Sequence, residues 1–279
     1  MIISGKTKLA GVLGWPVSHS RSPRLHGYWL DQAKIDGVYL PLPVRSEDFA
    51  RVLQSLPQMG FVGANVTLPH KEHALSLVDL VEPLAARIGA VNTLLFHTDG
   101  SIEGRNTDAF GFLANLQQNQ PKFHAHQAPA VILGAGGAAR AVLAALVDGG
   151  APEIRLVNRN QDRAQQLADQ IGGPVRVVSW DERAIALAGA GLLVNTTSLG
   201  MTGHLELELD LTDLPGDALV NDIVYAPLHT DLLVRAAKRG NPVVDGLGML
   251  LHQARPGFAA WFGPMPEVTP ALRKFVEEA

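Results

Sequence analysis

The chain has 279 residues, of which 47% are hydrophobic and 18% are charged, and its formal net charge at pH 7 is −4. This length is large for one hydrophobic core and suits two compact domains. The slightly negative charge and the lack of a long basic stretch argue against nucleic acid as a partner. The sequence contains no cysteine, which excludes disulfides, thiolate metal ligands and a cysteine nucleophile and is compatible with a reducing compartment.

No part of the sequence predicts export or membrane insertion. The N-terminus, MIISGKTKLAGVLGWP, lacks the features of a secretory signal peptide, and apolar runs such as residues 142–147 are too short to cross a bilayer. We therefore expect a cytoplasmic protein with no membrane partner.

Short apolar runs alternate with helical patterns in the first half of the chain, which is typical of βαβ units around a mostly parallel sheet. Strands are expected at residues 9–13, 38–42 and 63–67, helices near 47–56 and 70–78, and a hairpin of residues 92–97 and 101–104 around Thr98-Asp99-Gly100. Ser22, followed by Pro23, is expected to cap a helix that runs through Leu30.

The second half begins after a polar segment, residues 117–128, which has no pattern and is expected to be a connector. Strands are then expected at residues 130–133, 154–157, 175–178, 192–195, 218–221 and 243–244, with helices between most of them and C-terminal helices at 249–260 and 270–278. This regular alternation predicts an α/β fold with a doubly wound parallel sheet.

A glycine-rich turn follows the first strand of this second half. In AVILGAGGAARA, residues 130–141, the residues Gly134, Gly136 and Ala139 fill the G-x-G-x-x-G/A positions between a strand and a helix. The first glycine permits the tight turn, the second lets backbone N–H groups approach a pyrophosphate, and the small third residue lets the helix pack on the strand. The alternative is an ordinary strand–helix turn, but a second strand at the right distance favours a dinucleotide site.

The end of that second strand bears on the choice between NAD and NADP. An Asp or Glu there usually binds the ribose 2′-hydroxyl of NAD, whereas this chain has Asn158, then Arg159 and, one turn on, Arg163. Two guanidinium groups suit a 2′-phosphate, which arginine can bind through two hydrogen bonds. Both arginines could instead be solvated residues at a helix start, but the sequence favours NADP as the cofactor.

Polar side chains gather in five short strings elsewhere in the chain. They are GWPVSHSRSPRLHG with Ser20 and Ser22, NVTLPHK with Asn65, Thr67 and Lys71, GAVNT with Asn92 and Thr93, GRNTDAFG with Asn106, Thr107 and Asp108, and GLGMLLHQA with Gln253. The serines stand at a turn that enters a helix, which is a natural pocket for an anion.

In this order the five strings resemble the shikimate/quinate dehydrogenase family, and in particular shikimate dehydrogenase, from Gly11 to the last helix. The resemblance implies two domains. The first is an N-terminal α/β substrate domain completed by C-terminal helices, residues 1–107 with 246–279. The second is a Rossmann-like doubly wound dinucleotide-binding domain, residues 108–245. The implied activity is the reversible, NADP-dependent interconversion of 3-dehydroshikimate and shikimate in aromatic amino-acid (chorismate) biosynthesis.

The resemblance also implies roles for individual residues. The substrate carboxylate would be held by Ser20, Ser22 and Thr67 with Tyr225 nearby, the ring hydroxyls by Asn65, Asn92, Asp108 and Gln253, and Lys71 and Asp108 would be the catalytic pair. The cofactor phosphates would lie on Gly134, Ala135, Gly136, Gly137 and Ala138, the adenosine end on Asn158, Arg159 and Arg163, and the ribose and nicotinamide on Thr196, Met201, Gly246 and Met249.

The chain departs from the common family pattern at three positions. Gly27 stands where Asn is common, Ala109 where Gly is common, and Asn160 where Thr usually follows Asn-Arg. Only Asn160 adjoins an implied role, so the departures affect the detail of the adenosine contacts rather than the choice of cofactor.

The chemistry of these side chains supports the same roles independently. A polyhydroxylated acid needs many neutral hydrogen-bond partners, and a site built for hydroxyls rejects analogues that lack them. Hydride transfer at a carbonyl develops alkoxide charge, which the ammonium group of Lys71 can stabilise and protonate. The alternatives are that Lys71 lies exposed on a helix face and that Asp108 and Ser22 only cap helices.

Other functions and states are also possible on sequence grounds. One alternative is a family member that oxidises quinate with NAD, although such members tend to carry Thr at the position of Ser22 and an acidic residue at that of Asn158. Another is a non-catalytic NADP-binding regulator, which would not need to keep Lys71 and Asp108.

The histidine pairs His70/His73 and His124/His126 lack a third ligand at metal-site spacing, so no metal is expected. The partner is a small molecule, and the chain is expected to be a monomer or a homodimer.

Overall fold

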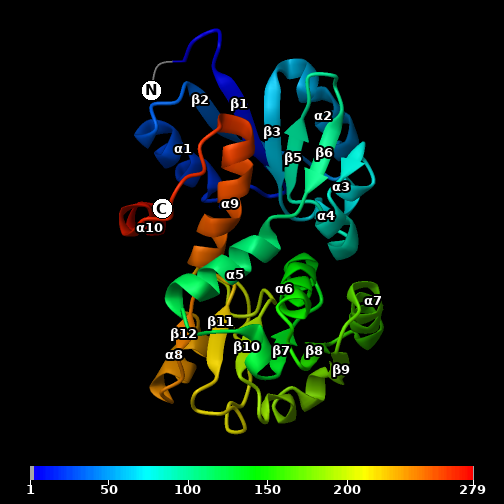
Figure 1. Cartoon of the computed structure of the whole chain (residues 1–279), viewed down its shortest axis with the longest axis vertical. Coiled ribbons are helices and arrows are strands. Elements are labelled where there is room, and N and C mark those ends of the chain that lie inside the picture. The colour runs from blue at the N-terminus through cyan, green and yellow to red at the C-terminus, as the bar shows by residue number, and fades with distance from the viewer. Residues whose placement is uncertain (1–2, 279) are drawn as a thin grey trace. The chain divides into compact units, whose positions relative to one another are not determined.

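The computed structural model describes residues 3–278. The chain divides into two compact units, one made of residues up to Gly111 together with Leu250 onward, the other of Phe112–Met249 (Figure 1). The chain leaves the first unit within helix α5 (Asp108–Asn119) and returns to it within helix α9 (Leu247–Phe262).

The first unit contains a six-stranded mixed sheet with the strand order β2-β1-β3-β5-β6-β4. Its strands are β1 (Lys8–Gly14), β2 (Gly37–Pro43), β3 (Phe61–Val66), β4 (Leu80–Val81), β5 (Thr93–Phe96) and β6 (Ile102–Arg105). β1 pairs in parallel with both β2 and β3, whereas β5 pairs antiparallel with β3 and β6. The three predicted strands and the predicted hairpin are confirmed. The edge strand β4 was not predicted, because two exposed residues carry no periodic signal.

Helices flank this sheet. They are α1 (Ser22–Gln32), α2 (Phe49–Ser55), α3 (Lys71–Leu75), α4 (Pro83–Ile88), most of α9, α10 (Pro270–Glu277) and the 3₁₀ turn η1 (Pro57–Met59). The prediction that Ser22 caps α1 is wrong: Arg21 holds the cap position without a side-chain hydrogen bond, and Ser22 is the first helical residue. Helix α3 is also shorter than the predicted residues 70–78.

The second unit contains a six-stranded, all-parallel sheet with the strand order β12-β11-β10-β7-β8-β9. Its strands are β7 (Ala130–Leu133), β8 (Ile154–Asn158), β9 (Val175–Ser179), β10 (Leu192–Asn195), β11 (Leu219–Asp222) and β12 (Val243–Val244). The order reverses between β7 and β10, and at such a point an open α/β sheet binds its ligand. All six predicted strands are confirmed, with ends that differ by no more than one residue.

The helices of the second unit connect these strands. They are α5, α6 (Gly137–Asp148), α7 (Gln161–Ile171) and α8 (Asp231–Lys238), with the 3₁₀ turns η2 (Ala125–Gln127), η3 (Trp180–Glu182) and η4 (Ile185–Leu187). The predicted connector 117–128 begins too early, because α5 continues through Asn119. The polar end of that helix has no apolar face that would distinguish it from a loop.

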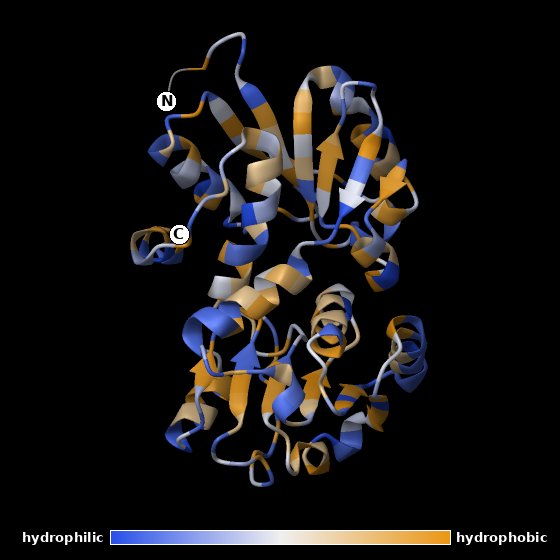
Figure 2. Cartoon of the chain, in the orientation of Figure 1, coloured by the Kyte–Doolittle hydropathy of each residue, from blue (hydrophilic) through white to orange (hydrophobic). Residues whose placement is uncertain are grey.

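Each sheet supplies much of the core of its own unit. Figure 2 shows that the strands of the second sheet are mostly hydrophobic, and Val131, Leu133, Leu193 and Val220 on these strands are completely buried. Fully buried parallel strands are expected to be continuous apolar runs of this kind. Among residues 3–278, no helix is long and apolar enough to cross a membrane.

An aromatic cluster in the first unit encloses His26. Its ring stacks on Tyr39 with 3.9 Å between centroids and 1° between planes, and the rings of Trp29, Phe258 and Trp261 surround it. Neither ring nitrogen has a hydrogen-bond partner in the described part of the chain. Burial lowers the pKa of His26 from 6.5 to about 3, so the folded protein keeps this ring neutral.

Replacing His26 by Phe should make the free energy of unfolding less dependent on pH between pH 7 and pH 5. Because the folded-state pKa is below the unfolded one, protonation favours the unfolded chain, and stability is lost as the pH falls from 6.5 toward 3. At pH 5 this loss is about 2 kcal/mol. Urea unfolding followed by tryptophan fluorescence at pH 7, 6 and 5 should show a loss that is about 2 kcal/mol larger in the parent chain than in His26→Phe, because the loss due to His252, whose pKa burial also lowers to about 4, occurs in both. The exposed His204→Phe is the control and should keep the parent slope; the same slope in all three proteins would contradict the burial argument.

Candidate active site

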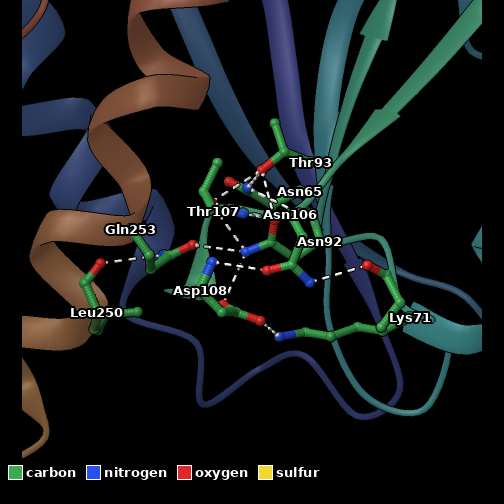
Figure 3. Close-up of polar contacts among 10 residues, drawn as sticks. Asn65, Lys71, Asn92, Thr93, Asn106, Thr107, Asp108, Leu250 and Gln253 are labelled. Carbon is green, nitrogen blue, oxygen red and sulfur yellow. Dashed lines mark hydrogen bonds and ion pairs between the residues drawn. The ribbon is translucent and has the colours of Figure 1, made fainter. Parts of the chain in front are cut away.

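Lys71 and Asp108 form an ion pair in the first unit, as Figure 3 shows. Lys71 is the first residue of α3 and Asp108 the first residue of α5, and Nζ lies 2.6 Å from Oδ2. The side chains are 16% and 7% exposed, respectively, so the pair is largely withdrawn from water. A sparsely hydrated ammonium held by one carboxylate is suited to stabilise negative charge on a neighbouring oxygen.

The amide of Asn92 organises the groups around this pair. Its Nδ2 donates to Asp108 Oδ1 at 2.8 Å and to Thr107 Oγ1 at 3.0 Å, and lies 3.3 Å from Gln253 Oε1. Its Oδ1 accepts hydrogen bonds from Thr107 N and Thr93 Oγ1, both at 2.9 Å. One amide therefore joins the strand β5, the start of α5 and the helix α9.

Asn65, at the end of β3, lies in the same network. Its Nδ2 donates to the backbone carbonyl of Asn92 at 3.0 Å and to Thr93 Oγ1 at 3.2 Å, and its Oδ1 accepts from the hydroxyl of Tyr39 at 2.6 Å. Tyr39 was not among the predicted site residues. In the sequence it is one aromatic residue in an apolar strand, which by itself indicates a core position.

The three residues predicted to bind a carboxylate follow two neighbouring strands. Ser20 and Ser22 come after β1, and Thr67 follows β3, whose backbone pairs with that of β1. The backbone N–H of Ser22 donates to Ser20 Oγ at 3.3 Å, and Thr67 N donates to the carbonyl of Leu13 at 2.9 Å. Ser20 and Thr67 are half-buried and Ser22 is buried, so these side chains offer neutral donors near the surface.

The structure thus connects Asn65, Lys71, Asn92, Asp108 and Gln253 through one set of polar contacts (Figure 3). The predicted substrate residue Tyr225 belongs to the second unit.

In the second unit, the turn after β7 has the features that a dinucleotide phosphate requires. Gly134 has φ +105°, and a Cβ there would lie 2.8 Å from Thr196 Oγ1, so any side chain would be strained and crowded. A Cβ on Gly136 would meet no atom within 4 Å, and helix α6 begins directly after it. No side chain caps α6 and no acidic residue lies in its first turn, so its first N–H groups and Gly137 and Ala138 suit a pyrophosphate.

The end of β8 carries the residues predicted for the adenosine side. Asn158 Nδ2 donates to the carbonyl of Asn160, and Asn160 Oδ1 accepts from Arg163 N at 2.9 Å and so caps α7. Asn160, which departs from the family pattern, therefore still performs the capping that threonine also can. Arg163 Nε donates to the carbonyl of Ala135 at 2.9 Å, which links this segment to the glycine turn, and Arg159 is exposed.

A buried carboxylate holds the two loops that follow β10 and β11. Asp222 accepts hydrogen bonds from Asn195 Nδ2 at 3.1 Å, Val224 N at 3.0 Å and Thr230 Oγ1 at 2.7 Å. Burial raises the pKa of Asp222, and these hydrogen bonds oppose the rise. The sequence analysis missed this network; the only signal was a polar pair, Asn195 and Asp222, at the ends of two neighbouring apolar strands.

The remaining residues predicted for the ribose and nicotinamide lie beside these loops or at the start of α9. Thr196 Oγ1 donates to the carbonyl of Leu133 at 2.6 Å, and Met201 is exposed. A Cβ on Gly246 would lie 2.1 Å from the carbonyl of Ile223, so only glycine fits there, and Met249 is buried. Within residues 3–278, no group of three or more His, Asp or Glu residues is placed to hold a metal ion.

Comparison with known proteins identifies the family. A family model described as the shikimate dehydrogenase substrate-binding domain matches residues 12–94, and one described as shikimate/quinate 5-dehydrogenase matches residues 115–201. Over 274 residues the chain is 64% identical to the NADP(+) shikimate dehydrogenase of Paramagnetospirillum magneticum, which covers 98% of this chain and 99% of that one.

Solved structures give the same result. Shikimate 5-dehydrogenase of Thermus thermophilus, in complex with NADP(H) and shikimate, has a TM-score of 0.85 and 37% identity, covering 98% of each chain. Quinate dehydrogenase of Corynebacterium glutamicum, in complex with NAD, has a TM-score of 0.91 and 31% identity, covering 98% of this chain and 99% of that one. These likenesses confirm the predicted α/β fold, with a substrate-binding domain and a Rossmann-like dinucleotide-binding domain. The chain belongs to the shikimate dehydrogenase family.

Proposed function

We propose that Lys71 and Asp108 are the catalytic pair with which this chain interconverts 3-dehydroshikimate and shikimate. The chain is an oxidoreductase that acts on a CH–OH group, with NADP as cofactor, in aromatic amino-acid biosynthesis. One observation carries the assignment of the pair: an ammonium and a carboxylate 2.6 Å apart among buried neutral amides and hydroxyls. Such surroundings suit a ring with several hydroxyls.

The substrate would lie on the first unit. Ser20, Ser22 and Thr67 would donate to its carboxylate, since none of them brings a charge and a carboxylate accepts hydrogen bonds from neutral donors. The ring hydroxyls would meet Asn65, Asn92, Asp108 and Gln253. The role of Tyr225 near the substrate carboxylate stays a prediction from the family resemblance. With these roles the two domains would be residues 1–107 with 246–279 and residues 108–245.

The chemical step needs a proton as well as a hydride. When bound, the nicotinamide supplies the hydride for reduction and accepts it in oxidation. In reduction, the ammonium of Lys71 stabilises the negative charge that forms on the substrate oxygen and gives its proton to it; in oxidation, the neutral amine takes that proton back. Asp108 holds the Lys71 nitrogen with Oδ2, while its Oδ1 is held by Asn92.

Replacing Lys71 by Ala should lower kcat by a factor of about a hundred or more with a small change in KM for shikimate, because this contact matters mainly in the transition state. Initial rates of NADPH formation with varied shikimate measure both constants. The exposed Lys6→Ala is the control and should leave them unchanged. A strongly raised KM with an unaltered kcat would make Lys71 a binding residue and would remove it from the catalytic pair.

The preference for NADP is expected to depend on Arg159. It is exposed beside the end of β8, where no carboxylate stands to bind a ribose hydroxyl. Arg159→Ala should raise KM for NADP about tenfold or more and leave KM for NAD nearly unchanged, because only the 2′-phosphate would lose a charged partner. Rates with each cofactor at saturating shikimate measure this, with Arg176→Ala on the neighbouring strand β9 as control. A parent chain that used both cofactors equally well would refute the assignment.

The nearest competing function is quinate oxidation with NAD, the activity and cofactor named for the Corynebacterium glutamicum neighbour. Ser22 and Asn158 argue against it, since Thr and an acidic residue are expected there in quinate enzymes. Quinate and NAD as substitutes in the same assay separate the two functions, and turnover itself separates an enzyme from a non-catalytic regulator. A cytoplasmic location and a monomeric or homodimeric state stay predictions.

A further inference from the structure

Tyr39 contacts a residue of the proposed substrate site. Its hydroxyl donates to Asn65 Oδ1 at 2.6 Å, and Asn65 is proposed to hold a ring hydroxyl. Tyr39 itself is only 6% exposed, and burial raises its pKa well above the ordinary value. The phenol is therefore neutral at any working pH and keeps its proton as a donor.

The direction of each hydrogen bond at Asn65 is fixed by its neighbours. The backbone carbonyl of Asn92 can only accept, so the Nδ2 of Asn65 must face it and Oδ1 must face Tyr39. The second hydrogen of Nδ2 goes to Thr93 Oγ1. Both donor hydrogens of Asn65 are thus committed inside the protein, and one lone pair on Oδ1 remains. In this arrangement Asn65 can accept a hydrogen bond from a substrate hydroxyl and cannot donate one.

The ring of Tyr39 is held in place from α1. His26 stacks on it with parallel planes, so packing supports the direction in which the phenol donates to Asn65.

We propose that Tyr39 is a positioning residue that acts on substrate recognition through Asn65. Its hydroxyl holds Oδ1 of Asn65 in place, while the carbonyl of Asn92 and the hydroxyl of Thr93 hold Nδ2. The remaining lone pair of Oδ1 is therefore directed to a substrate hydroxyl that donates to it. This inference rests on the proposed role of Asn65.

Tyr39→Phe removes the phenol oxygen and keeps the ring on His26. We expect KM for shikimate to rise about tenfold, kcat to fall less than threefold and KM for NADP to stay unchanged, because one neutral hydrogen bond is lost on the substrate side alone. Tyr28→Phe is the matched control: its ring packs on Phe275 with 5.1 Å between centroids, and its kinetic constants should equal those of the parent. Urea unfolding of both variants shows whether each is folded.

A double-mutant cycle with Asn65→Ala tests the route of the effect. If Tyr39 acts through Asn65, the rise in KM caused by Tyr39→Phe should shrink to less than threefold in the Asn65→Ala background. If the two substitutions instead raise KM by independent factors that multiply in the double variant, the proposal is overturned. Equal losses in kcat and in both KM values would also overturn it, because they would make Tyr39 merely structural. A parent chain that turns over shikimate while Tyr39→Phe keeps the parent KM would overturn this inference alone. A parent chain without NADP-dependent turnover of shikimate would overturn the proposed function with it.

Discussion

The side-chain amide of Asn92 is the contact on which the arrangement of the first unit depends. Its nitrogen holds Asp108 Oδ1, and this leaves Oδ2 for the ammonium of Lys71. Its oxygen accepts a hydrogen bond from the backbone N–H of Thr107, where the chain enters α5. Because a buried amide left without partners costs about 1–3 kcal/mol, any rotation of Asn92 would disturb Asp108 and Thr107 together. The neutral amide of Asn92 therefore determines which carboxylate oxygen of Asp108 faces Lys71.

The second unit also contains a buried carboxylate that neutral groups hold in place. Asp222 is completely buried, and neutral groups on Asn195, Val224 and Thr230 donate to it. A buried carboxylate without a cation is costly, and its raised pKa reflects that cost. Its hydrogen bonds connect the loops after β10 and β11, which carry Thr196 and Tyr225. The carboxylate in the first unit faces the ammonium of Lys71, whereas Asp222 holds two loops together.

Much of the fold could be predicted because buried parallel strands are continuous apolar runs with polar residues at their ends. The strands β7 and β10 were therefore predicted to the residue. Helix α5 was not predicted, since its last turn, rich in Gln and Asn, resembles a loop. The cap prediction at Ser22 was wrong by one residue, because the helix begins at Ser22 with Pro23 in its first turn and Arg21 holds the cap position.

The residues of the candidate site could be named from the family resemblance, and their roles stay predictions, but the sequence pattern does not encode the contacts between them. Lys71 and Asp108 could be named from family resemblance, but the contact between them spans 37 positions and that between Asn92 and Gln253 spans 161. No periodicity encodes such pairings. The same holds for Tyr39, whose strand pattern indicates only a core residue, although its hydroxyl reaches Asn65.

The two arginines near β8 are not equally available for the proposed contact with the 2′-phosphate. Arg163 donates from its backbone N–H to Asn160 and from Nε to the carbonyl of Ala135, so part of its guanidinium is already engaged with the glycine turn. Among residues 3–278, Arg159 makes no such contact, and its side chain is exposed. A guanidinium with all its donors available can bind a phosphate through two of them. We therefore expect discrimination of the 2′-phosphate to fall mainly on Arg159, while Arg163 links the glycine turn to the start of α7. If the glycine turn holds the phosphates as proposed, loss of Arg163 should disturb the binding of either dinucleotide.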